Sequence, residues 1–205
     1  MKSNKFDHLL KFSATTCGIK GHLDILDCFL HSAQVLHAHA YDGRAANRQG
    51  LIGQVTDEVW NGDLITAFYL LRHSLELAVK ALIYVIKEIE VIMEGKERMD
   101  INVRGHDIND LWKNHIPSNY KKEFSNQIND AFTVLEKHGV LHNEQLFRYH
   151  ASIGKDDVTT LEDLPNISSE DFEKLFSAVD IIRCEVWSAL LTKKNLLSMS
   201  GESVA

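Results

Sequence analysis

The sequence contains little proline, glycine or cysteine, and each shortage limits the folds that it can adopt. Only 2 of the 205 residues are proline and 11 are glycine, which favours long helices over a turn-rich β architecture. The three cysteines are odd in number and widely spaced, at Cys17, Cys28 and Cys184. They match neither a disulfide framework nor a zinc-binding pattern, so we expect a chain that works in the reducing cytoplasm.

Long apolar runs are also missing. The N-terminal segment MKSNKFDHLLKF has no apolar core of the kind that a signal peptide needs. The most apolar stretch, residues 64–93, is interrupted by Arg72, Glu76, Lys80 and Lys87, which makes it a poor membrane span. The sequence therefore predicts a chain without a membrane partner.

An excess of basic residues is absent as well. The formal net charge is −7 at pH 7, and the isoelectric point lies near 5.9. Non-specific binding to nucleic acid rests on clustered lysines and arginines that neutralise phosphates. The charge balance argues against a broad nucleic-acid surface and leaves only a local basic patch open.

Helical periodicity, in contrast, runs through most of the chain. The composition is 44% hydrophobic and 25% charged, as in an average soluble globular protein. Apolar residues recur at helical spacing, and glycine, proline and polar residues mark the ends. The expected helices span residues 23–42, 56–94, 106–117, 118–139 and 168–191, and the second of them is expected to break or to begin near Asn61 and Gly62. We therefore predict an all-α fold, a bundle of four main helices plus one short helix.

Capping signals and domain limits follow from this pattern. Asp107, Ser118 and either Ser168 or Ser169 are the expected N-caps, and Gly95 and Gly139 are the expected stops. The segment 140–167 has no clear periodicity and is expected to be irregular. The predicted division of the chain is an N-terminal extension over 1–22, a single helical domain over 23–192 and a flexible tail over 193–205.

One apolar segment of the expected long helix carries charged residues at regular spacing. Residues 68–83, FYLLRHSLELAVKALI, are apolar enough for a protein core, yet Arg72, Glu76 and Lys80 recur there at four-residue spacing. At about 100° per residue, these side chains and His73 form one polar strip, while roughly 200° of the helix surface is apolar. We expect a central helix that packs on more than one neighbour. The strip is either a solvated face with weak ion pairs or a polar groove in which Glu76 orients Arg72 and Lys80 toward an anionic ligand or another chain.

Three short segments follow one another along the chain: RHSLELAVKAL at 72–82, GHDINDLW at 105–112 and FRYH at 147–150. Together they resemble the HEPN-like helical-bundle proteins of bacteria, in which the last segment often reads Phe-Arg-Tyr-Pro. The resemblance covers about residues 60–155. It rests on the joint occurrence of the three segments, since each one is short.

The resemblance implies a helical bundle that usually dimerises and acts in toxin–antitoxin or phage-defence systems. Some members cleave RNA, and others bind nucleic acid or nucleotides without catalysis. The ribonucleases carry an arginine followed four to six residues later by a histidine, and no arginine of this sequence meets that spacing. The sequence therefore favours a non-catalytic binding module. The alternative is a metal-independent ribonuclease that uses arginine with His73 and His106 at a dimer cleft.

The expected site combines the polar strip with the third segment. Its predicted ligand-binding residues are Arg72, Glu76, Lys80, Arg148 and Tyr149. An arginine between two aromatic residues of a loop is hard to explain by core packing. Arg148 is therefore interpreted either as a ligand contact or as an anchor of its loop to a carboxylate such as Glu76. His106 is interpreted either as a packing residue beside the Asp107 cap or, in the ribonuclease alternative, as a catalytic residue.

No cofactor and no metal site are expected. A zinc site on a helix prefers ligands four residues apart, and His37 and His39 point about 200° away from each other. The expected partners are a second copy of the chain, RNA or a nucleotide, and a cognate protein. The expected location is the cytoplasm.

Overall fold

The computed structural model describes residues 5–48, 57–95, 103, 105–141, 151–153, 158–160 and 167–199. Most of these residues belong to three long helices: α1 (Lys5–Arg48), α2 (Asp57–Glu94) and α7 (Ser169–Met199). The shorter elements are α3 (Ile108–His115), α4 (Ser118–Glu123), α5 (Ser125–Lys137), β1 (Ala151–Ile153) and β2 (Val158–Thr160). The two strands pair antiparallel, with Ser152 opposite Thr159.

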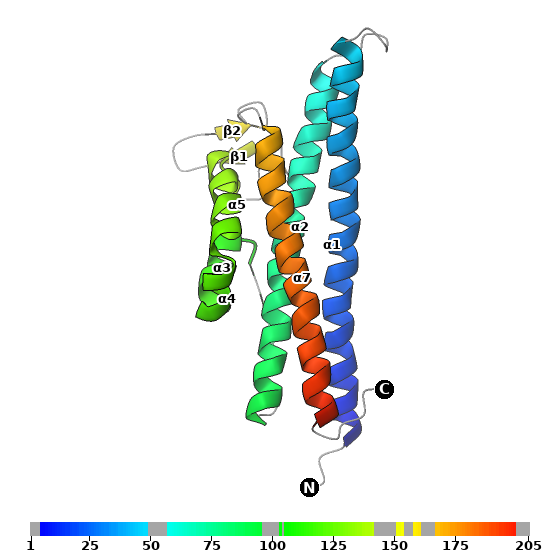
Figure 1. Ribbon diagram of the computed structural model, residues 1–205, viewed down its shortest axis with the longest axis vertical. Coiled ribbons are helices and arrows are strands. Elements are labelled where there is room, and N and C mark those ends of the chain that lie inside the picture. The colour runs from blue at the N-terminus through cyan, green and yellow to red at the C-terminus, as the bar shows by residue number, and fades with distance from the viewer. Residues whose placement is uncertain are drawn as a thin grey trace.

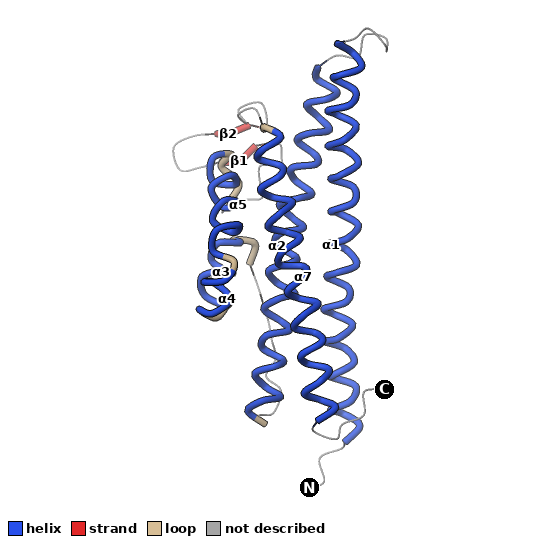
Figure 2. The backbone as a smooth tube through the Cα atoms, viewed as in Figure 1, coloured by secondary structure: helices blue, strands red, loops and turns tan. Residues whose placement is uncertain are grey.

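The three long helices form the body of the molecule. α1 and α2 run antiparallel, and α7 follows the direction of α2 (Figure 1). α2 packs against both α1 and α7, while α5 packs against α7 and α3 against α2. The short helices therefore form a second layer on one flank of the bundle (Figure 2). The described part of the chain is mostly helical, which confirms the all-α prediction. Within it, three long and three short helices replace the expected four main helices and one short one, and two short strands lie in the segment expected to be irregular.

The central position of α2 follows from its broad apolar arc. The α2 residues that are fully buried include Phe68, Leu71, Leu75, Val79 and Leu82. Full burial of one such side chain contributes about 1.5–3 kcal/mol relative to its exposure. Both covering helices, α1 and α7, belong to the same chain. The prediction that this helix packs on more than one neighbour is thus confirmed.

Two of the predicted caps begin their helices. The side chain of Asp107 accepts a hydrogen bond from the backbone N–H of Asp110 at 3.0 Å, at the start of α3. Ser168 Oγ accepts one from the backbone N–H of Asp171 at 3.1 Å, and Asp171 Oδ2 accepts one from the N–H of Ser168 at 3.0 Å. This reciprocal pair satisfies N–H groups that the first turn of α7 would otherwise leave unbonded.

The helix predicted over 118–139 is divided in two. α4 ends at Glu123 and α5 begins at Ser125, and Phe124 between them has φ −104° and ψ 13°. Phe124 packs against the core. Tertiary packing therefore breaks the helix at a position where the periodicity predicted no break. Ser118 is the first residue of α4 rather than its cap. Gly139 does end the segment, with φ +70°, a conformation that suits glycine.

Both predicted helix limits at the ends of the chain were wrong. α1 begins at Lys5 rather than near residue 23, so the extension predicted over 1–22 is helical over most of its length. α7 continues to Met199, so the predicted flexible tail begins as helix, with Lys193 and Leu197 buried. The helix before residue 23 was not predicted because its apolar residues show only weak helical periodicity. Residues 193–199 were predicted to be a flexible tail because Lys193, which is buried, is a polar residue type. The remaining residues of the predicted tail lie outside the described residues.

Candidate functional site

The candidate site is centred on one buried carboxylate. Glu76 lies on α2 and is only 3% exposed. Its Oε2 accepts a hydrogen bond from Arg72 Nη1 at 3.0 Å, and its Oε1 accepts one from Lys80 Nζ at 2.8 Å. The three residues lie one helical turn apart and therefore share a face. Because Arg72 and Glu76 are buried, the polar strip is not the solvated face that the simpler interpretation required.

The turn before α3 brings an imidazole to the same carboxylate. His106 Nδ1 lies 2.8 Å from Glu76 Oε1, and the His106 side chain is 51% exposed. Gly105, which precedes it, has φ +103°, a conformation that favours glycine. With the proton on Nδ1 facing the carboxylate, the basic lone pair of the neutral ring is on Nε2.

Arg72 connects three separate segments of the chain. Its side chain is fully buried. Besides its bond to Glu76, it donates from Nε to the carbonyl oxygen of Val140 at 2.9 Å and from Nη2 to the carbonyl oxygen of His106 at 2.8 Å. The guanidinium thus holds the turn before α3 and the turn after α5 against α2. Arg72 therefore positions the other site residues from inside the molecule.

His73 flanks Glu76 on the side of α1. Its Nδ1 is 3.8 Å from Glu76 Oε2, and its side chain is 15% exposed. Its Nε2 forms a 2.8 Å hydrogen bond with the hydroxyl of Tyr69. The ring also lies next to Phe29 of α1, with 6.0 Å between the ring centroids. The carboxylate therefore has an imidazole on each side, His106 and His73.

The cluster carries a net positive charge in an acidic protein. Burial raises the pKa of the Glu76 carboxyl, but the hydrogen bond and charge of Lys80, the charge of Arg72 and the hydrogen bond of His106 outweigh it and lower the pKa. Glu76 is therefore ionised at neutral pH, with one negative charge beside the two cations Arg72 and Lys80. Even with both imidazoles neutral, the cluster is cationic overall, and Lys80, 12% exposed, is its cation nearest to solvent.

The structure brings together most of the residues that the sequence predicted for the site. Arg72, Glu76 and Lys80 lie in one hydrogen-bonded cluster, which the histidines of the ribonuclease alternative join. Arg148 and Tyr149 lie outside the described residues. Sequence reasoning missed the carbonyl of Val140, because a backbone acceptor leaves no signal in the residue types.

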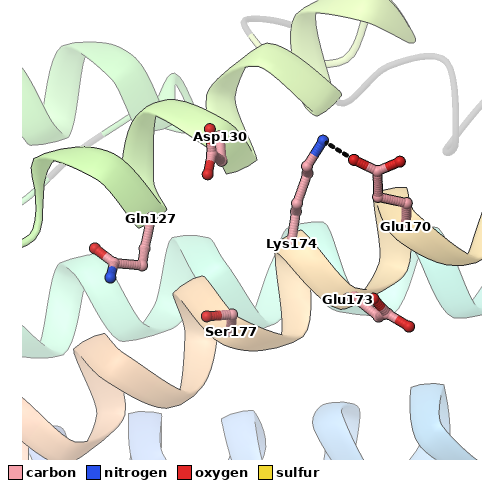
Figure 3. Close-up of a pocket in the computed structure, with 6 residues that line it drawn as sticks. All are labelled: Gln127, Asp130, Glu170, Glu173, Lys174 and Ser177. Carbon is pink, nitrogen blue, oxygen red and sulfur yellow. Dashed lines mark ion pairs between the residues drawn. The ribbon is translucent and has the colours of Figure 1, made fainter.

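A shallow pocket lies elsewhere, between α5 and α7 (Figure 3). It has a volume of about 250 Å³. The lining residues are Gln127, Asp130, Glu170, Glu173, Lys174 and Ser177. Its one cation, Lys174, pairs with Glu170 at 2.6 Å. The pocket is therefore acidic, and its lysine–glutamate pair is exposed, whereas the Lys80–Glu76 pair is largely buried.

Two further observations concern the described ranges as a whole. They contain no group of three or more histidine, cysteine, aspartate or glutamate side chains that could hold a metal ion. In the same ranges, every helix is too short or too polar to cross a membrane.

No protein-family model, curated protein or solved structure matches the chain. Its function is therefore inferred from the geometry of the site and from the resemblance of its sequence segments.

Proposed function

We propose that the chain is a HEPN-like, non-catalytic binding module that holds a phosphate-bearing ligand, RNA or a nucleotide, at the Glu76 cluster. By the same resemblance, it acts in the cytoplasm of a bacterium, in a defence or stress system and beside a cognate protein partner. One observation carries this proposal. A single buried carboxylate, already neutralised by Arg72 from within, holds the partly buried Lys80 and the half-exposed His106.

The local charge explains why the ligand is an anion. A phosphate can take charge-assisted hydrogen bonds from an ammonium or imidazolium group. Lys80 keeps N–H groups beyond the one that it donates to Glu76, since an ammonium has more than one. Glu76 holds this ammonium in place, which reduces the side-chain entropy lost when a ligand binds. Because the chain has a formal net charge of −7, we expect nucleic acid to bind only at this patch.

We expect Lys80→Ala to weaken the binding of a fluorescein-labelled single-stranded RNA by about tenfold. A hydrogen bond to a charged group contributes about 1.5–3 kcal/mol, and about 1.4 kcal/mol corresponds to tenfold in affinity. Fluorescence anisotropy at pH 7.5 measures the effect, with ATP as an unlabelled competitor to separate RNA from nucleotide binding. Lys194→Ala, an exposed lysine of α7, is the matched control. Equal affinities of the two variants would contradict the proposal.

A second candidate function is metal-independent cleavage of RNA. The observation that favours it is the 2.8 Å contact of His106 Nδ1 with Glu76 Oε1, because a carboxylate orients an imidazole for proton transfer. Incubation of the protein with total RNA separates the two functions. Cleavage that His106→Ala and His73→Ala abolish would establish the ribonuclease and refute the non-catalytic module.

We also propose that the chain forms a homodimer. The apolar arc of α2 does not support this, since α1 and α7 cover it. The support comes from Trp187 and Leu191, which lie one turn apart on α7 and are 52% and 63% exposed. Tryptophan is enriched where interfaces form.

We expect a sedimentation mass of twice the 23.3 kDa chain at micromolar concentration. Trp187→Glu should shift the protein toward the single-chain mass, because a charge at the interface opposes burial. Met93→Glu, at an exposed methionine of α2, is the control and should leave the mass unchanged. A wild-type mass near 23.3 kDa would rule the dimer out.

A further inference from the structure

A second buried polar cluster joins the end of α5 to the start of α7. Asp171 Oδ2 accepts hydrogen bonds from Lys137 Nζ at 2.9 Å and from the backbone N–H of Ser168 at 3.0 Å. His138 Nε2 lies 3.3 Å from the same oxygen. Asp171 is 5% exposed and His138 is 2% exposed. We call this cluster the His138 joint.

Among the described residues, the second nitrogen of His138 has no hydrogen-bond partner. Nδ1 is buried, and the ring packs edge-on against Phe68 of α2, with 5.0 Å between the centroids. A buried nitrogen that carries only a lone pair is tolerated more easily than a buried N–H without an acceptor. The packing therefore suits a neutral ring that donates from Nε2, since a second proton on Nδ1 would have no acceptor in the described part of the chain.

The joint is continuous with the candidate site through three consecutive residues. His138 is followed by Gly139 and by Val140, whose carbonyl oxygen accepts the bond from Arg72 Nε. The backbone N–H of Val140 donates to the carbonyl of Leu135 at 2.9 Å, so the turn is closed by its own hydrogen bond. Release of His138 from α7 would open this turn and remove the acceptor of Arg72.

We propose that the His138 joint is an acid-sensitive latch that regulates the Glu76 site by holding or releasing the Val140 carbonyl. The regulation rests on the proposed function, since it assumes that the Glu76 cluster binds a ligand. Proton uptake by His138 favours the open turn, in which Arg72 loses its bond to Val140. Arg72 also holds the backbone of His106, so the opening loosens the surface imidazole of the site.

The direction of the pH dependence follows from the surroundings of the ring. Burial lowers the pKa of His138, and so does the charge of Lys137. The hydrogen bond and the charge of Asp171 raise this pKa, but burial outweighs them. α2 contributes the uncharged ring of Phe68. In the open turn the imidazole recovers its ordinary pKa of 6.5 and binds a proton more readily. The latch is therefore fully closed above about pH 6.5 and weakens as the pH falls below that value.

Asp171 does not titrate in the same range. Burial raises the pKa of its carboxyl, but the hydrogen bonds from Lys137, Ser168 and His138 outweigh burial and hold the pKa well below its ordinary value of 3.8. Its contribution to stability is present above about pH 3.8 and is lost only in stronger acid. A response of the joint between pH 6.5 and 5.5 therefore comes from His138 and not from Asp171.

Hydrogen exchange measured by NMR tests the latch without any ligand. The probes are the backbone amide of Val140 and the Nε–H of Arg72, each corrected for its intrinsic exchange rate. One proton taken up on opening changes the equilibrium by up to about tenfold per pH unit, so both probes should open several-fold more at pH 5.5 than at pH 6.5. Exchange that does not depend on pH overturns the latch. A response of Val140 without Arg72 overturns the coupling to the site.

Two variants sharpen the test. His138→Phe keeps an aromatic ring beside Phe68 and cannot titrate, so its exchange should not change between the two pH values. His31→Phe, at an exposed histidine of α1, should keep the wild-type response. If His138→Phe does not fold, the wild-type profile alone decides. RNA binding at pH 7.5 separates the two proposals: binding with pH-independent exchange refutes only the latch, and pH-dependent exchange without binding refutes only the proposed ligand.

Discussion

Replacing Glu76 by alanine should lower the free energy of unfolding by about 3–5 kcal/mol, the cost of breaking a buried ion pair by removing one partner. The carboxylate faces Arg72, Lys80 and His106. Its loss leaves the fully buried guanidinium of Arg72 without the only carboxylate that pairs with it among the described residues. The two backbone carbonyls that Arg72 also contacts carry no full charge and cannot replace it.

Urea titration followed by circular dichroism measures this loss. Glu136→Ala, at an exposed glutamate of α5, should change the stability by less than about 1 kcal/mol, as exposed charges do. Glu76→Gln should fall between the two, since an amide keeps an acceptor for Arg72 but not the charge. A loss below about 1 kcal/mol for Glu76→Ala would show that the cluster is a solvated strip, and the candidate site would lose its physical basis.

Lys193→Ala should cost a similar amount, about 3–5 kcal/mol. Lys193 Nζ lies 2.5 Å from Glu88 Oε2, and both residues are at most 5% exposed. The substitution removes the ammonium that compensates a buried carboxylate and also leaves a void beside the core. Lys194→Ala, at the neighbouring exposed position of α7, is the control and should have little effect in the same urea titration.

A double variant distinguishes the cost of an isolated charge from the value of the pair. Glu88→Leu combined with Lys193→Met replaces both charges by apolar groups of similar size. Such replacements of buried ion pairs are often neutral or stabilising, so the double variant should be more stable than Lys193→Ala. If it were no more stable than Lys193→Ala, the pair itself would stabilise α7 against α2.

The sequence was sufficient to predict the central helix and the polar strip. Both depend on spacing within one helix, and a period of 3.6 residues can be read from local sequence. The spacing assigns the strip to Arg72, Glu76 and Lys80, and all three lie in the cluster. Burial of the strip does not follow from the spacing, because it depends on elements that are distant in sequence.

Two features could not have been found from spacing. Arg72 is bonded to backbone oxygens, and any residue type offers a backbone oxygen, so Val140 carries no recognisable signal. Lys193 is a polar residue type in any periodic pattern. For this reason the flexible tail was predicted to begin at this position. Its burial depends on Glu88, which lies 105 residues away in the chain. The same limitation applies to His106, whose partner Glu76 lies 30 residues earlier.

The three-way attachment of Arg72 has a consequence for the order in which the chain folds. Its acceptors at His106 and Val140 lie 34 and 68 residues away, and contacts between distant residues form only after the loops between them have closed. During synthesis, α2 emerges before either acceptor exists. A nascent chain that ends before Val140 therefore has the cations of α2 but not the arrangement that holds them. Under the proposed function, the chain can bind its ligand only after the second layer has docked, so partly folded chains would not bind it.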